Sequence, residues 1–300
     1  MKKEKEKRGV NSRETKGYKV FQGFNVVIMI IISAVTLYPF LYLVAQSFSS
    51  EKAIMKGLVN IIPVDFNLTT YISVIKKGDF QRYYLNTLIY TVVGTTLSVL
   101  FSSLLAYPLS KKDLRFGGFF SKFIIFTMYF GGGLIPNYVL MTRLGLKDTI
   151  WGFLLPGMIG TYYVILMRSF FESVPHELEE AGELDGLNKL GVFFRIVVPL
   201  SKPIIATMVL FYASGIWNNW FTAYLYLDTK EKWPVAYYIK TIITGASTSA
   251  DPGEATAETM QIAANIKSCS MVLMALPIIC VYPFVQKYYV QGMMLGGVKE

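Results

Sequence analysis

Residues 177–199, ELEEAGELDGLNKLGVFFRIVVP, form the longest charged segment between two strongly apolar blocks of this chain. Pro175 and the glutamates that follow it are typical of a helix start, because negative charge stabilises the N-terminal end of a helix. Gly186 can adopt the left-handed conformation that ends a helix. The apolar residues after Gly186 predict a second short helix that stops at Pro199. The rest of the chain indicates where these two helices lie.

The composition of the whole chain is that of a membrane protein. Hydrophobic residues make up 53% and charged residues 16% of its 300 residues, and the mean hydropathy is +0.42. Soluble domains carry fewer apolar and more charged residues. A soluble two-domain enzyme is therefore disfavoured. The chain has room for several membrane spans of about 20 residues each.

Six apolar blocks predict six transmembrane helices and an all-α integral membrane protein. Only helices and closed barrels satisfy their backbone in lipid, and these blocks lack the alternation of barrel strands. The first block is too long for a secretory signal. Residues 1–20 are therefore predicted to be a cytoplasmic basic tail, and residues 21–300 a transmembrane domain. The predicted spans are residues 21–46, 84–109, 119–141, 150–167, 203–227 and 268–286.

The basic residues predict an orientation. With the N-terminus in the cytoplasm, 18 of the 29 Lys and Arg residues fall on the cytoplasmic side. Positive residues are enriched in cytoplasmic loops. Both termini and the loop of residues 171–202 are therefore predicted to be cytoplasmic. The net charge of +9 is then explained by orientation in the membrane, and it does not imply a nucleic acid as partner.

The sequence lacks the residue patterns typical of catalysis, ATP binding and proton or ion conduction. His176 is its only histidine and is expected in a charged loop rather than a pocket, and no P-loop sequence for ATP is present. The predicted spans carry no Asp, Glu, Arg or His in their middles, where proton relays and ion pathways need them. These absences disfavour a membrane-bound enzyme and a self-contained secondary transporter. They predict no catalytic residue, no metal site and no cofactor in this chain, and an energy source outside it.

Pattern alone leaves residues 177–199 open to interpretation as an amphipathic helix lying in the membrane interface. The residues, however, resemble the EAA motif of ABC importer permeases, EAA-x3-G-x9-I-x-L-P, with both gaps kept. The motif departs from the family pattern at Gly182, where Ala is usual, and at Val198, where Leu is usual. Glycine lowers helix propensity by about 1 kcal/mol relative to alanine. The matching residues are Glu180-Ala181-Gly182, Gly186 and Ile196-Val197-Val198-Pro199.

The resemblance continues from about Ser47 to the C-terminus. This part of the chain is similar to the carbohydrate branch of these permeases, at the smaller of the two permeases in maltose-type importers. The run from Phe130 to Pro136, FGGGLIP, resembles a subgroup associated with complex oligosaccharides, including those that contain uronates. Further supporting segments are residues 63–68 with Tyr71, Asn86-Thr87, residues 144–149, Trp217-Asn218 and residues 292–299.

This resemblance implies a type I ABC importer permease in the bacterial plasma membrane. It implies import of sugars, with oligosaccharides expected, and a non-sugar solute is the alternative. The implied partners are a second permease, two ATPase subunits that hold ATP and Mg, and an extracellular substrate-binding protein. The loop of residues 171–202 would dock on an ATPase, and the C-terminal tail would contact the same subunits. The implied coupling residues are Glu180, Ala181, Gly182, Gly186, Ile196 and Pro199, and the implied tail contacts are Gly296, Gly297 and Lys299.

Aromatic residues gather toward the outer end of the fifth predicted span. They could stack on sugar rings, or they could form the aromatic belt common to membrane interfaces. The candidate pathway residues are Trp217, Asn218, Trp220 and Tyr224. The identity of the sugar does not follow from this chain, because other subunits share in selectivity.

Overall fold

The computed structural model describes residues 16–76, 78–248, 265–281 and 283, and every regular element within these ranges is a helix. The all-helical prediction is thus confirmed for these residues. The chain divides into two compact units, residues 1–67 and residues 68–300, and each is described by itself.

The first unit holds α1 (Lys16–Ser47) and α2 (Glu51–Met55). The 31-residue part of α1 from Gly17 to Ser47 contains an 18-residue window with a mean hydropathy of 2.4, and none of this window is buried within the protein. At 1.5 Å per residue it is long enough to cross a membrane. Ser50 caps α2, because its hydroxyl accepts a hydrogen bond from the Ala53 N–H at 3.2 Å.

The second unit is assembled around α4 (Gly78–Leu109). Small residues recur every four positions along one face of α4, and the series continues to Ser110 just beyond the helix. All of these residues are buried. In lipid, helices associate through close packing of such small residues. A Cβ atom added to Gly94 would lie 2.7 Å from side-chain carbons of both Ile216 and Leu154. The small residues of this face are Gly94, Ser98, Ser102, Ala106 and Ser110.

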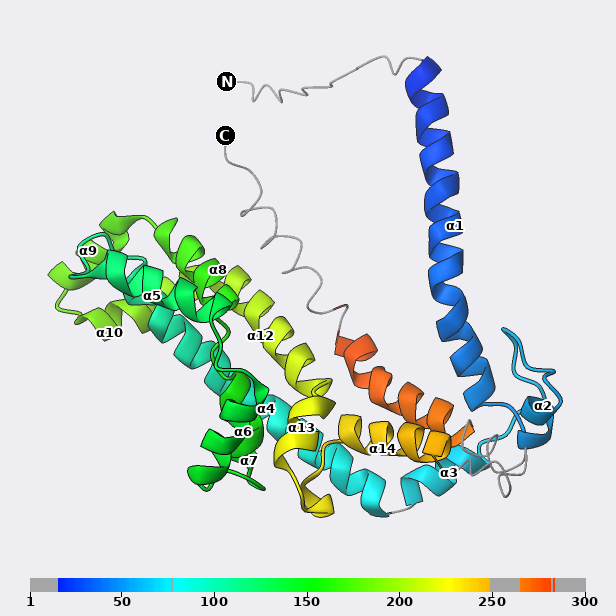
Figure 1. Ribbon diagram of the computed structural model, residues 1–300. Helices are drawn as coiled ribbons and strands as arrows, with labels where there is room; N and C mark the ends of the chain where they lie inside the picture. Colours follow the sequence, from blue (N-terminus) through cyan, green and yellow to red (C-terminus); the bar gives the residue numbers. More distant parts are fainter. Residues whose placement is uncertain (1–15, 77, 249–264, 282, 284–300) are drawn as a thin grey trace. The chain divides into compact units, whose positions relative to one another are not determined.

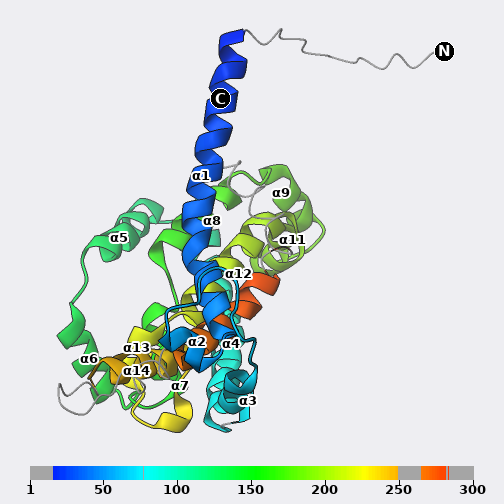
Figure 2. The ribbon, with the colours of Figure 1, turned by 90° about the vertical axis from the view of Figure 1, so that its right-hand side faces the viewer.

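Two helices lie along α4, α8 (Thr161–Glu172) and α12 (Lys202–Trp217), as Figures 1 and 2 show. A core of α4, α8 and α12 side chains joins them. Tyr212 of α12 sits within this core with 4% of its surface exposed. Its hydroxyl lies 2.6 Å from the Ser102 hydroxyl and accepts a hydrogen bond from the Gly160 N–H at 2.9 Å. The Tyr212 side chain thus links α12 to α4 and to the start of α8. It also provides the acceptor for the Gly160 N–H at the break between η1 and α8.

Three of the predicted spans are broken helices. Residues 119–141 become α5 (Gly117–Tyr129) and α6 (Leu134–Arg143), with a bend of 108° between them. The glycines of residues 131–133 allow this bend, and Gly133 has a φ of +87°. Residues 150–167 become α7 (Ile150–Leu154), the 3₁₀ turn η1 (Leu155–Gly157) and α8, bent by 55°.

The fifth predicted span also differs from a single helix. Residues 203–227 are divided between α12 and α13 (Trp220–Tyr226), because Asn219 caps a new helix by accepting from the Thr222 N–H at 3.0 Å. Before α12 come α10 (Lys189–Val192), the π-helical turn η2 (Phe193–Val197) and α11 (Val198–Leu200), and residues 189–200 bend by 85° from α12.

The remaining elements lie at the two ends of the α4, α8 and α12 bundle. The helix α9 (His176–Leu184) and α10 lie at one end. The 3₁₀ turn η3 (Lys230–Lys232) and α14 (Val235–Thr248) belong to the other end together with α13 (Figures 1 and 2). The second unit also contains α3 (Thr69–Lys76) and an apolar helix, Asn265–Val281.

Replacing Tyr212 by Phe is expected to destabilise the second unit. The change leaves the Gly160 N–H without its acceptor in an apolar environment, which costs about 1–3 kcal/mol. The measurement is the midpoint of thermal unfolding of the purified protein in detergent. Tyr162→Phe is the matched control, since Tyr162 is 54% exposed. An equal effect of the two substitutions would contradict a structural role for the Tyr212 hydroxyl.

Candidate functional site

The helix α9 presents a mostly exposed surface. Its first turn carries Glu177 and Glu179, as expected of a helix N-terminus. Glu180 and Ala181 are exposed, and so are two apolar side chains, Leu178 at 44% and Leu184 at 89%. A helix that exposes apolar side chains between charged ones is suited to contact another protein surface.

The end of α9 is fixed by a glycine cap. Gly186 has a φ of +90°, which is the left-handed conformation predicted from the sequence. Its N–H donates to the Glu183 carbonyl at 3.0 Å, and the Leu187 N–H donates to the Gly182 carbonyl at 2.9 Å. These two hydrogen bonds form a Schellman motif, which ends the helix and reverses the chain.

The reversal brings the two halves of the EAA-like motif into contact. A Cβ atom on Gly182 would lie 2.4 Å from Cδ1 of Ile196 and 3.6 Å from Cγ2 of Val192. Gly182 is therefore a position of close approach between α9 and η2, which explains why glycine is accommodated where the family pattern has alanine. Pro199, the last residue of the motif, is exposed in α11. The spacing of the motif thus corresponds to a contact between α9 and the returning chain.

The returning segment is firmly anchored in the bundle. Val192, Phe193 and Val197 are fully buried. The Phe193 ring lies 5.0 Å from the Tyr107 ring of α4 and 6.3 Å from the Phe171 ring of α8, measured between centroids. Aromatic contacts of this kind add to the energy of burial. The helix α9 therefore rests on a segment that cannot move without disturbing α4 and α8.

Glu179 is a buried residue of α9 that the sequence pattern did not distinguish from its neighbours. It is 3% exposed. It forms an ion pair with Lys111, just beyond α4, and accepts a hydrogen bond from the Tyr107 hydroxyl at 2.9 Å. Its position three residues before Gly182, on the same helical face, was a signal that could have indicated its burial.

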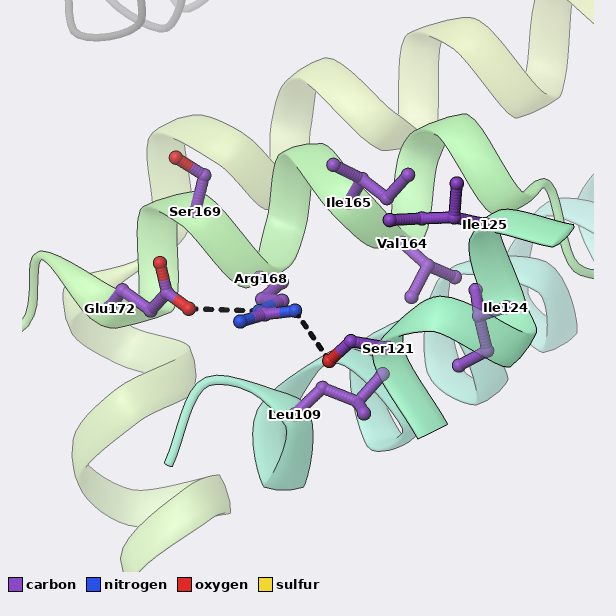
Figure 3. A pocket seen from close by; sticks show the side chains of 9 residues that line it. All are labelled: Leu109, Ser121, Ile124, Ile125, Val164, Ile165, Arg168, Ser169 and Glu172. Carbon is purple, nitrogen blue, oxygen red and sulfur yellow. Dashed lines mark hydrogen bonds and ion pairs between the residues drawn. The ribbon is translucent and has the colours of Figure 1, made fainter. Parts of the chain in front are cut away.

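Arg168 fastens α5 to α8 at the same end of the bundle. Figure 3 shows its guanidinium between Glu172 and Ser121, at the edge of a mostly apolar pocket of about 180 Å³. The Arg168 Nε atom donates to Glu172 at 2.8 Å, and Nη1 donates to the Ser121 hydroxyl at 2.7 Å. Because α5 itself has no buried residue, this polar contact helps to hold it against α8.

The prediction that His176 lies in a charged loop rather than a pocket is wrong as to the pockets of this end of the bundle. His176 lines two of them, of about 860 and 420 Å³, next to Lys111 and Glu179. The expectation failed because it rested on the charge of the loop, whereas the pockets arise where α9 meets the end of α4. The His176 Nδ1 atom lies 3.3 Å from Glu180 Oε1. Within the described residues no group of three or more His, Cys, Asp or Glu side chains could hold a metal ion.

A polar clasp fastens the opposite end of the bundle. Asp148, at a φ of +56°, accepts hydrogen bonds from the N–H groups of Asp228 and Thr229 and from the Lys232 ammonium. Burial raises the pKa of the Asp148 carboxyl, but the hydrogen bonds from Lys232 and Thr229 outweigh it and lower the pKa to about 2. Asp148 is therefore ionised throughout the physiological pH range.

The start of α4 fastens the same loop from its other side. The Asn86 side chain donates to the Glu231 carbonyl at 2.7 Å, and the Thr87 hydroxyl accepts from the Val235 N–H at 2.8 Å. Both residues belong to segments that carried the family resemblance. The clasp and these contacts hold η3 and the start of α14 in one position.

The candidate pathway residues differ in their accessibility. Trp217 is 5% exposed, and its indole N–H donates to the Met274 carbonyl at 3.1 Å. Asn218 is exposed, as are Trp220 at 37% and Tyr224 at 58%. The ammonium group of Lys240 in α14 lies 5.0 Å from the centroid of the Trp220 ring. An accessible aromatic surface with an adjacent cation thus lies on α13, and the Trp217 indole lies behind it in the packed interior.

The C-terminal residues Gly296, Gly297 and Lys299 lie outside the described part of the chain. Their predicted contact with an ATPase stays a prediction.

Comparisons with known proteins identify the family. A profile described as "Binding-protein-dependent transport system inner membrane component" matches residues 9–295. The chain belongs to this family. Protein LplC of Bacillus subtilis is 38% identical over 285 residues, which cover 95% of this chain and 97% of LplC. The polygalacturonan/rhamnogalacturonan transport system permease protein YtcP of the same organism is 36% identical over 272 residues, covering 90% of this chain and 95% of YtcP.

A solved structure agrees with this assignment. A chain in the crystal structure of a bacterial ABC transporter involved in the import of the acidic polysaccharide alginate superposes with a TM-score of 0.82 at 34% identity. The match covers 92% of this chain and 98% of that one. The permease is thus a membrane component of an ABC importer with the type I permease fold, and the family and fold predicted from the sequence are confirmed.

Gly186→Pro is expected to abolish transport while leaving membrane insertion intact. Proline fixes φ near −65° and has no N–H, so it can neither adopt the observed φ nor donate to Glu183. Gly186→Asn is the matched control, because asparagine tolerates the left-handed region. The measurement is substrate uptake by cells, normalised to the amount of permease in the membrane. Normal uptake with Gly186→Pro would contradict a role for this cap in transport.

Proposed function

We propose that α9 is the element through which this permease receives force from an ATPase subunit. The observation that carries the proposal is the division of α9 into an exposed face with Glu180 and Ala181 and a buried face fixed by Gly182. An exposed helix on a rigid base can transmit a displacement, whereas a helix lying free in the membrane interface would slide. The proposed coupling residues are Glu180, Ala181, Gly182, Gly186, Ile196 and Pro199.

The proposed assembly contains this permease, a second permease, two ATPase subunits and an extracellular substrate-binding protein. ATP and Mg are bound by the ATPase subunits, whose closure drives alternating access of the spans. The basic residues near the N-terminus and in the α9 loop support a cytoplasmic location for the α9 end. The α13 and η3 end then faces the outside, where the binding protein delivers its ligand.

The proposed substrates are acidic oligosaccharides that contain uronate units. YtcP is a permease of a polygalacturonan/rhamnogalacturonan transport system, and the transporter of the similar crystal structure is involved in the import of the acidic polysaccharide alginate. In this chain, Lys240 beside the exposed Trp220 ring supplies a cation for a carboxylate and an aromatic surface for a sugar ring. The alternative is a permease for neutral sugars or for another solute. Transport measurements distinguish it from a permease for acidic oligosaccharides.

Reconstitution tests the proposed function directly. The permease, co-purified with its partner subunits, is placed in liposomes with ATP, and the uptake of labelled oligogalacturonate is compared with that of a neutral oligosaccharide of the same length. ATP-dependent uptake of the acidic chain, requiring the binding protein, is expected. Uptake by the permease alone, driven by an ion gradient, would instead identify a secondary transporter. Preference for the neutral chain would contradict the substrate class.

Lys240→Gln is expected to raise the half-saturating concentration of an acidic oligosaccharide about tenfold, because a hydrogen bond to a charged group contributes about 1.5–3 kcal/mol. Transport of a neutral chain should change little. Lys230→Gln, which removes an exposed positive charge from η3 at the same end, is the control. Equal effects of the two variants would show a general electrostatic effect and refute a specific contact with Lys240.

A further inference from the structure

The buried face of α9 contains a charge. Within this helix the buried residues are Glu179 and Gly182. Gly182 contacts η2 and Val192, which belong to the same loop as α9. Glu179 instead reaches Lys111 and Tyr107, which lie 68 and 72 positions earlier in the sequence. The carboxylate therefore joins α9 directly to the end of α4.

The contact between Glu179 and α4 uses both carboxylate oxygens. The Lys111 ammonium pairs with Oε1, and the Tyr107 hydroxyl donates to Oε2 at 2.9 Å. The same ammonium lies 4.6 Å from the centroid of the Tyr107 ring. The exposed fractions of the two charged side chains are 20% for Lys111 and 4% for Glu179. Because a charge buried to this extent is costly without its partner, the three groups favour a single arrangement.

The position of this contact gives it a mechanical consequence. Tyr107 lies in the last turn of α4 and Lys111 lies two residues beyond its end, and α4 packs along α8 and α12 through its small residues. Two pockets of about 860 and 420 Å³ border the contact, and both are lined by Lys111 and Glu179. No large apolar side chain of α9 is buried at this point. The polar contacts thus carry the direct connection between α9 and α4.

We propose that Glu179, Lys111 and Tyr107 form the link that transmits a displacement of α9 to α4, with Glu179 as a positioning residue of the coupling step. The proposal rests on the function of α9 proposed above and assigns the path by which its movement enters the bundle. The exposed face of α9 binds the ATPase, and the buried carboxylate converts the movement of that face into a push on the end of α4.

The test is Glu179→Gln in the complete transporter, reconstituted with its ATPase and binding protein. Glutamine keeps the size and an acceptor for Tyr107 but removes the charge that pairs with Lys111. The expected result is assembly with the ATPase and sustained ATP hydrolysis, with transport per ATP lowered about tenfold, which is within the range typical of coupling between two sites. Wild-type transport per ATP in the Glu179→Gln variant would overturn the proposal.

Two further variants separate transmission from folding. The double variant Glu179→Lys with Lys111→Glu restores the ion pair with the two charges exchanged. It should recover much of the wild-type transport per ATP. If Glu179→Gln does not assemble, the double variant Glu179→Met with Lys111→Met removes both charges without leaving one buried alone. Loss of coupling in that double variant supports the link, and normal coupling refutes it.

Lys189→Gln is the matched control. Lys189 also pairs with a glutamate of α9, Glu183, but its side chain is 73% exposed and the pair stays within the loop. Exposed pairs contribute little, so this variant should keep the wild-type ratio. A wild-type transporter that fails to bind an ATPase, or to use ATP, would refute the proposed function itself. A working wild type with unaffected Glu179 variants would refute the link alone.

Discussion

The close approach of helices along the small-residue face of α4 is the constraint on which the second unit depends. Lipid tails are as apolar as the side chains that face them, so burial of apolar surface does not by itself hold spans together. Gly94, Ser98, Ser102 and Ala106 let neighbouring backbones come near, and the Tyr212 hydroxyl adds hydrogen bonds within the contact. The hydrogen bond to Gly160 is equally necessary, because a broken span leaves a backbone N–H that lipid cannot satisfy.

The EAA-like motif gains a physical meaning from this arrangement. Its spacing allows a helix, a left-handed cap at Gly186 and a return that places Ile196 against Gly182. Phe193 then enters the core between Tyr107 and Phe171. The motif is thus a folded unit with one exposed and one anchored side, and that division is what a coupling element requires.

Local signals were sufficient where a residue acts through its own backbone. Gly186 was predicted correctly because the left-handed region that ends a helix selects few residue types. The breaks in residues 119–141, 150–167 and 203–227 were missed, since hydropathy does not report a change of helix direction. The glycines of residues 131–133 and the paired Asn218 and Asn219 were visible signals of two of them.

Long-range contacts could not be predicted in the same way. Glu177, Glu179 and Glu180 look alike in the sequence, and only the folded chain shows that Glu179 meets Lys111. Trp217 likewise resembles the exposed Trp220 until its hydrogen bond to Met274 places it in the interior. In both cases the deciding partner lies more than fifty positions away, and local pattern carries no information about it.

Both ends of α4 are fastened by polar contacts, whereas its middle is held by close packing. At one end Asn86 and Thr87 bind the loop around η3, and at the other Tyr107 binds Glu179. A helix held in this way behaves as a strut, because a hydrogen-bonded helix resists changes in length and its small-residue face resists separation from α8 and α12. A movement imposed near Tyr107 must therefore either break the contact with Glu179 or shift the far end of α4. That far end carries the loop next to α13, so the geometry joins the proposed ATPase side to the proposed substrate side through one helix.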